Sequence, residues 1–440
     1  MNRLDDRTKL AVKNISVSFV LRGASMFITF LLIPITLGYL NPYEYGIWVT
    51  LNSILSWVYF LDIGLGNGLK NKLAEAIAVG DYERGRVYVS TTMFLMSLII
   101  LCFYTLFLCA NLFLDWYGIL SVDEAKVDNL NSLVIMVFAF VSLNFVTKIV
   151  GNIYQAYQKT AVNDLLLFLG NALSLLIIVV LTKTTSGSLT SIALTYSVVP
   201  VIISLVALPV TFKKYHQISP SLKFVRLNQV KNLALLGVNF FIIQIACVVL
   251  FMTSNVIISN LFGPEEVTPY NIASKYYSVI SFGYNIILSP FWVATTDAFS
   301  KGDFLWIKRT ILKIFYIWVA LSALVVVMYL LSPFVYDLWI GESVVIQREM
   351  TLWSGIYVAI LTLSNTFAIF INGFGKLRIQ LIFSVLQTIF YIPLAIYCGK
   401  LFGVYGILIA MCITCFMSLL WSPRQCWLLL NNKAYGWWNK

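Results

Sequence analysis

Residues 88–113, YVSTTMFLMSLIILCFYTLFLCANLF, form an apolar run of 26 residues without a charged side chain. A helix needs about 20 predominantly apolar residues to cross the hydrocarbon core of a bilayer. The run is continuous and lacks the alternating pattern of a membrane-spanning strand. It therefore predicts a transmembrane α-helix, in which the backbone satisfies its own hydrogen bonds.

Eleven further stretches of the chain have the same character. Of the 440 residues, 60% are hydrophobic and only 11% are charged, whereas a soluble domain has about 25% charged residues. A soluble core cannot hide this much apolar surface, so we predict an all-α, polytopic membrane protein with about 12 transmembrane helices. The spans lie approximately at residues 15–40, 45–66, 88–113, 130–151, 164–182, 190–211, 233–260, 269–295, 312–333, 350–372, 379–399 and 403–423.

The basic residues predict the orientation of these spans, because cytoplasmic connections are enriched in lysine and arginine. Of the 30 basic residues, 24 fall in the terminal segments and in every second connection, four fall on the opposite face, and Arg22 and Lys275 lie within spans. Both termini are therefore predicted to be cytoplasmic. The net charge of +11 is explained by this topology, and no nucleic-acid partner is expected.

The connections on the opposite face are short and acidic. The longest, near residues 114–129 and 334–349, have about 16 residues each, too few for the catalytic domain of a membrane glycosyltransferase or polymerase. The glycines of GLGNGLK (64–70) follow a predicted helix and lack the Walker spacing, so they do not predict a nucleotide site. The seven cysteines lie in or beside spans and give no metal-ligand set. We expect no enzyme activity, no metal and no cofactor.

The second half of the chain repeats the first at an offset of 222 residues, mainly in connections, where apolar composition alone cannot produce matches. The matches pair Pro42, Glu44, Glu75, Ala76, Gly80, Asp81, Tyr82, Arg86, Asp115, Ser121 and Val122 with Pro264, Glu266, Asp297, Ala298, Gly302, Asp303, Phe304, Lys308, Asp337, Ser343 and Val344. The repeat predicts six-helix lobes at residues 1–211 and 233–440, joined by a basic cytoplasmic linker at 212–232. Because six is even, both lobes enter from the same side and are related by a pseudo-two-fold axis along the membrane normal.

Two similar lobes in a membrane favour a transporter that works by alternating access, in which a central cavity opens first to one face and then to the other. A duplicated membrane scaffold without transport activity is the alternative. Because the chain has no ATP-handling signature, transport would draw on an ion gradient, the membrane potential or the gradient of the substrate itself.

Arg22 is the first candidate for a substrate-binding residue. It lies about seven residues inside the first predicted span, where a charged side chain costs about 3 kcal/mol on insertion scales. Such a residue should face a cavity or a partner, although a long side chain can also reach the headgroups by snorkelling. The repeat places Gln244 at the equivalent position of the second lobe. Asp62, near the inner end of the second span, either pairs with Arg22 across helices or marks the helix end.

Lys148 is a second candidate, near the inner end of the fourth predicted span. It precedes a polar strip with the spacing of one helix face, made by Asn152, Gln155 and Gln158. Lys148 and the polar strip could together line the inner mouth of the cavity. Equally, Lys148 could be a topology signal beside the interfacial anchors Tyr154 and Tyr157.

Lys275, near the outer end of the eighth predicted span, is a third candidate, although snorkelling explains its position more simply. Asn255, Asn365 and Gln387 are polar residues within later spans. Such residues more often make hydrogen bonds between helices than contacts with a ligand.

The chain resembles a known family at three stretches after the buried Arg22. These are LLIPITLGYLNPYEYGIW (31–48), LDIGLGNGLKNKLAEA (61–76) and GDYERGR (80–86). They are similar to the polysaccharide flippases of bacterial O-antigen and capsule loci. That family belongs to the superfamily that also holds the multidrug and toxin extruders and the lipid II flippase.

The resemblance implies a function. It implies movement of an undecaprenyl-pyrophosphate-linked oligosaccharide from the inner to the outer leaflet of the bacterial cytoplasmic (inner) membrane. The partners it implies are this lipid-linked oligosaccharide and membrane lipid, with a polysaccharide polymerase and glycosyltransferases as further candidates. Arg22 matches a basic first-helix residue of several relatives, with Lys148 and Lys275 as companions. Arginine can hold a pyrophosphate through two parallel charge-assisted hydrogen bonds. The second lobe has Gln244 at the position where a symmetric cavity would have a second cation, so the resemblance does not extend to phosphate binding by both lobes.

The alternative function is an ion-coupled exporter of drugs or organic cations with the same fold. Such an exporter would use carboxylates within the membrane to bind its cations, and Asp62 is the one carboxylate that this reading of the spans supplies. A scaffold, in contrast, predicts that replacement of Arg22 affects folding without a transport defect.

Overall fold

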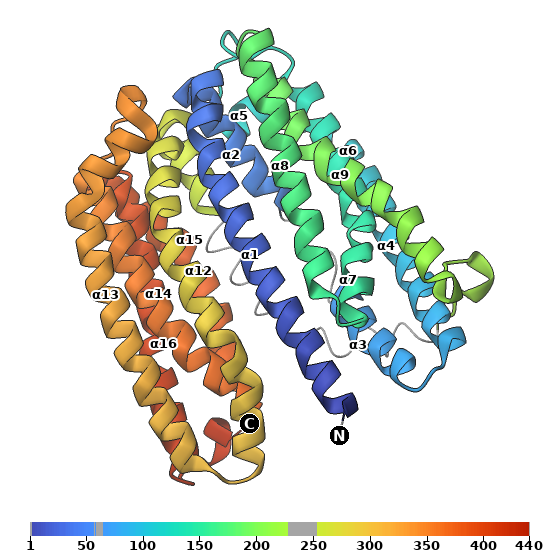
Figure 1. The fold of residues 1–440 in the computed structure, drawn as a ribbon. Coiled ribbons are helices and arrows are strands. Elements are labelled where there is room, and N and C mark those ends of the chain that lie inside the picture. Colours follow the sequence, from blue (N-terminus) through green and yellow to red (C-terminus); the bar gives the residue numbers. More distant parts are fainter. Residues whose placement is uncertain (1, 57, 59–64, 228–252, 440) are drawn as a thin grey trace. The chain divides into compact units, whose positions relative to one another are not determined.

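The computed structural model describes residues 2–56, 58, 65–227 and 253–439, which contain helices and their connections and no strand (Figure 1). The first helices are α1 (Asn2–Tyr39), α2 (Pro42–Ser56), α3 (Leu65–Ala78), α4 (Tyr82–Asn111), α5 (Trp116–Leu120), α6 (Leu130–Thr147), α7 (Ile149–Ala156), α8 (Thr160–Thr184), α9 (Leu189–Lys214), and the 3-10 turns His216–Ile218 and Leu222–Phe224. They are followed by α12 (Pro264–Ser300), α13 (Phe304–Ile340), α14 (Arg348–Phe374), α15 (Arg378–Phe402), α16 (Tyr405–Leu430), and the 3-10 turns Gly341–Ser343 and Gly436–Asn439. The all-α fold class is confirmed.

Nine helical segments within the described residues are long and apolar enough to cross a membrane. They carry large hydrophobic side chains on their outer surfaces, such as Leu330 and Phe334 of α13, which are 64% and 69% exposed. This exposure is costly in water and normal against lipid. The chain is therefore a polytopic membrane protein. Of the other predicted spans, the eighth corresponds to α12, the second is described only in part, and most of the seventh lies outside the described residues.

The chain divides into two compact units, residues 1–241 and 242–440. The part of the predicted linker that is described packs on the first unit: Arg86 of α4 donates a hydrogen bond from Nε to the carbonyl oxygen of Ser219 at 2.7 Å. The same guanidinium lies 4.3 Å from the ring centre of Phe224. The lobe boundaries at 211 and 233 stay a prediction.

The repeat at an offset of 222 residues is visible in the backbone of two turns. Gly80 and Gly302 both have positive φ, 76° and 73°, a conformation that glycine adopts without strain. The next residues, Asp81 and Asp303, cap α4 and α13 and accept hydrogen bonds from the backbone N–H three residues on, at 2.9 and 3.0 Å. The same helix start is thus built twice by the same residue types.

A close approach between α15 and α16 gives a first testable prediction. A Cβ on Gly406 would lie 2.1 Å from the carbonyl oxygen of Cys398, a backbone atom that cannot rotate away. Overpacking of this kind typically costs about 1–3 kcal/mol. We expect Gly406→Ala to lower the thermal unfolding temperature of the detergent-purified protein. Gly283→Ala in α12, where the added carbon meets nothing within 4 Å, should leave it unchanged or raise it. Equal behaviour of the two variants would contradict the packing.

Candidate functional site

The second unit contains a polar cavity of about 550 Å³, within the range of about 300–1,000 Å³ that is usual for ligand sites. Its lining is Asn255, Tyr270, Asn271, Ser274, Lys275, Ser278, Ser281, Asn285, Ser354, Tyr357, Val358, Leu361, Asn365, Leu408 and Met411. Lys275 is the one charged side chain among these lining residues. The second unit thus contains a partly open chamber whose lining residues include many hydroxyl and amide side chains and one lysine.

The spacing of polar residues along α12 and α14 explains why this chamber forms. On α12, Asn271, Ser274, Ser278 and Asn285 recur at intervals of three, four and seven residues and so share one helix face. The neighbouring positions carry Ile272, Tyr277 and other buried residues that pack away from the chamber. The helix α12 is therefore amphipathic, with its polar face lining the cavity. It is not among the nine strongly apolar segments.

A second compartment of the same unit, of about 120 Å³, lies among α14, α15 and α16. It shares Tyr357, Leu361, Asn365 and Met411 with the larger chamber. Its lining is completed by Ser364, Ala368, Gln380, Ser384, Gln387, Thr414, Cys415, Ser418, Trp421 and Ser422, none of which is charged. The two compartments thus have a common wall along α14.

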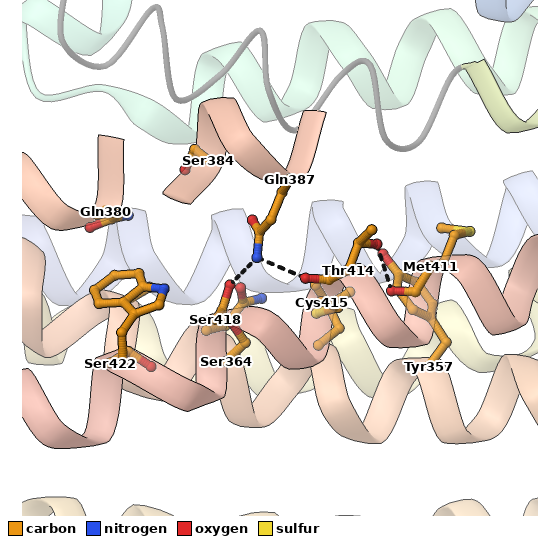
Figure 2. Close-up of a pocket in the computed structure, with 14 residues that line it drawn as sticks. Tyr357, Ser364, Gln380, Ser384, Gln387, Met411, Thr414, Cys415, Ser418 and Ser422 are labelled. Atoms are coloured by element: carbon orange, nitrogen blue, oxygen red, sulfur yellow. Dashed lines mark hydrogen bonds between the residues drawn. The ribbon is translucent and has the colours of Figure 1, made fainter. Parts of the chain in front are cut away.

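Gln387 joins α15 to α16 across this second compartment (Figure 2). Its Nε2 donates hydrogen bonds to the carbonyl oxygen of Thr414 at 2.8 Å and to Oγ of Ser418 at 2.7 Å. The prediction that Gln387 makes a hydrogen bond between helices is confirmed. Asn365, in contrast, lies in the lining of both compartments.

In the first unit, α1 and α8 lie side by side and are joined by paired polar side chains (Figure 1). Arg22 donates a hydrogen bond from Nε to Oδ2 of Asp164 at 3.0 Å. One turn earlier on both helices, the hydroxyls of Ser18 and Thr160 lie 3.4 Å apart. Near the other end of α1, Tyr39 and Thr185 share a hydrogen bond of 2.8 Å. The Asp164 side chain is 2% exposed and that of Arg22 is 53% exposed. The carboxylate of the pair is therefore buried, and the arginine is accessible.

The Arg22–Asp164 pair corrects the sequence-based prediction on one point. The statement that Asp62 is the one carboxylate within the spans is wrong, because Asp164 is buried in α8. Asp62 itself lies outside the described residues, so its pairing with Arg22 stays a prediction. Asp164 stands at the very edge of the fifth predicted span, where a charged residue normally marks a helix end.

Lys148 lies at the junction of α6 and α7, beside a cavity of about 270 Å³ in the first unit. Its ammonium group lies 4.7 Å from the ring centre of Phe145, a distance at which a cation is attracted to the ring face. The cavity is also lined by Asn144, Asn163 and Asn171. The predicted polar strip at Asn152, Gln155 and Gln158 is not part of this lining.

With the fold and the cavities described, comparison with known proteins identifies the family. The model of a family described as polysaccharide biosynthesis protein matches residues 11–293. The chain belongs to this family. Two curated relatives of the chain are a putative O-antigen export protein of Yersinia pseudotuberculosis and a putative O-antigen transporter of Salmonella typhimurium strain LT2. Each is 23% identical, over 91% and 90% of this chain and 92% and 91% of the relative.

The fold of the chain is similar to that of solved transporters described as members of the MOP superfamily. An inward-facing multidrug resistance MATE family transporter matches with a TM-score of 0.71 at 17% identity, over 96% of this chain and all of that chain. The outward-facing conformation of a MATE family transporter matches with a TM-score of 0.65 at 16% identity, over 96% of each chain. At these identities the likeness concerns the fold alone.

The candidate residues that the structure describes are divided between the two units. Lys275 lies in the large chamber of the second unit, and Arg22 and Lys148 belong to the first. Gln244 and Asp62 lie outside the described residues. Asp164, Gln380 and Trp421 were not predicted as site residues. The available signal was a polar or amphipathic side chain at or within two residues of the end of a predicted span.

Proposed function

We propose that the protein is a flippase that moves undecaprenyl-pyrophosphate-linked oligosaccharide from the inner to the outer leaflet of the bacterial cytoplasmic membrane, for cell-surface polysaccharide synthesis. The observation that carries this proposal is the chamber of the second unit, in which Lys275 is the one charged side chain among the described lining residues. An ammonium group is a good point charge for a phosphate. The surrounding hydroxyl and amide groups suit the hydroxyls of a sugar.

Family membership and the names of the relatives support a substrate that contains polysaccharide. The two units are proposed to work by alternating access, with both termini in the cytoplasm as the distribution of basic residues predicts. The proposal assigns transport and no catalysis to the chain. Membrane lipid would surround the undecaprenyl tail, and a polysaccharide polymerase and glycosyltransferases are proposed as neighbours in synthesis.

The second candidate is an ion-coupled exporter of drugs or organic cations. Asp164 favours it, because a buried carboxylate within a membrane unit is the group that such an exporter needs. The 3.0 Å contact with Arg22 opposes it, since the arginine already balances the negative charge. The large chamber opposes it further, because a lysine in the lining repels a cationic drug.

The experiment measures leaflet exposure of a labelled undecaprenyl-pyrophosphate oligosaccharide, carrying the native repeat unit, in cells that lack their own flippase. We expect label in the outer leaflet only when the intact protein is present. The same cells are tested for efflux of cationic dyes. Dye efflux without leaflet exposure would replace the flippase by the exporter. The absence of both activities would favour a scaffold.

A further inference from the structure

Three buried polar atoms of the smaller compartment have no hydrogen-bond partner within the described residues. They are Oε1 of Gln380, Nε1 of Trp421 and Oγ of Ser422. The three residues are only 9%, 6% and 2% exposed. Buried polar atoms in native proteins are nearly always satisfied, and each orphan carries a desolvation penalty. Three such atoms around one small compartment therefore point to an occupant that bonds to them.

The chemistry of the compartment narrows what the occupant is. The carbonyl oxygen of Gln380 accepts a hydrogen bond, the indole of Trp421 donates one, and the hydroxyl of Ser422 does either. Figure 2 shows Gln380 and Ser384 of α15 across the compartment from Ser418 and Ser422 of α16. None of the described lining residues is charged, so they offer no opposite charge to balance an ion that enters the compartment. A neutral ligand with neighbouring hydroxyls satisfies donors and acceptors together.

The indole of Trp421 is held in place by its neighbour. Its ring is stacked on Phe383 of α15 with centroids 5.5 Å apart. Its N–H therefore has a fixed direction, which a site for hydroxyl groups needs if it is to select among them. Gln387 and Ser418, also in the lining, are already bonded to each other at 2.7 Å and hold the two helices together.

We propose that this compartment is a sugar subsite of the second unit, in which Gln380, Trp421 and Ser422 bind hydroxyl groups of the oligosaccharide. The inference rests on the proposed function and adds to it the place where the uncharged part of the substrate is recognised. The volume of about 120 Å³ holds one ring edge. The neighbouring chamber of about 550 Å³, with Lys275, accommodates the remainder and the charged end.

The test uses the full-length protein in lipid nanodiscs and two separate probes. One is the free repeat-unit oligosaccharide, released from its lipid by mild acid, and the other is undecaprenyl pyrophosphate without sugar. The variants Gln380→Met, Trp421→Phe and Ser422→Ala each remove one polar group and nearly preserve volume. Ser332→Ala in α13 is the matched control, because Ser332 is equally buried but bonds only to the carbonyl oxygen of Tyr329 in the described structure.

We expect each subsite variant to weaken binding of the oligosaccharide by about threefold to tenfold, the usual effect of one lost hydrogen bond. Binding of undecaprenyl pyrophosphate and the thermal unfolding temperature should stay at the values of Ser332→Ala. Unchanged oligosaccharide binding in all three variants would mean that water satisfies these atoms, and it would overturn the subsite. An intact protein that flips the lipid-linked substrate but does not bind the free oligosaccharide would overturn it equally. An intact protein that does not flip at all would instead overturn the proposed function.

Discussion

Arg22→Ala is expected to abolish outer-leaflet exposure of the lipid-linked oligosaccharide, and a second substitution, Asp164→Ala, is expected not to restore it. Arg22 presents more than half of its side chain while one nitrogen holds Asp164. The rest of the guanidinium fork remains available for a pyrophosphate, which arginine binds well. Removal of this charge therefore removes a substrate contact.

The single variant alone cannot separate binding from folding. Arg22→Ala leaves the carboxylate of Asp164, which is 2% exposed, without its charged partner inside a membrane unit. An uncompensated carboxylate at such depth costs about 3 kcal/mol, so the single variant should also unfold at lower temperature. The double variant removes both charges, and its stability should recover most of that loss.

Stability and transport are compared in the intact protein, Arg22→Ala, Asp164→Ala and the double variant. This comparison decides between two roles for Arg22. A double variant that is stable and inactive places Arg22 in substrate binding. A double variant that regains transport would show that Arg22 serves only to neutralise Asp164, and the pyrophosphate role would have to be given up. Abundance in the membrane is matched before leaflet exposure is compared.

Lys275→Met is expected to reduce the rate of leaflet exposure by about tenfold to a hundredfold, the effect of losing one hydrogen bond to a charged group. Methionine keeps the length of the lysine stem and removes its charge. Lys275→Arg should retain most of the rate. Because the described residues that line the chamber include no carboxylate to balance the ammonium group, Lys275→Met should not lower the unfolding temperature.

The control for this variant is Lys400→Met, at an exposed position near the end of α15 in the same unit. It loses one positive charge from the same unit without touching the chamber. Equal rates for Lys275→Met, Lys400→Met and the intact protein would remove Lys275 from the mechanism. A defect in Lys275→Met together with weaker binding of undecaprenyl pyrophosphate would place the lysine at the charged end of the substrate.

The fold was predictable because its determinants are local in sequence. A continuous apolar run specifies a span without reference to other helices, and the Gly80 and Gly302 turns recur because the same dipeptide requires the same backbone. Lys275 was found as a charge within a span, but its chamber depends on which face of α12 meets α14. That face is set by packing between helices.

The partner of Arg22 was not predictable for the same reason. Asp164 follows Arg22 by 142 residues, and a single sequence does not say which of the other helices lies against α1. When each helix is considered alone, Gln380 is an ordinary residue near the start of a helix. Ser422 is likewise an ordinary small residue of its helix. They become a site because α15 and α16 pack with these positions on facing sides.

The polar contacts of α1 limit how this helix can move during transport. Pro34 lies inside α1, where its missing N–H makes a natural point for bending. Arg22 lies before this proline and holds α8, and Tyr39 lies after it and holds the same helix at Thr185. A bend at Pro34 would have to break one of these links or carry α8 along. The polar contacts thus couple the two helices mechanically on both sides of Pro34, and a substrate that competes for Arg22 would remove one of the three contacts.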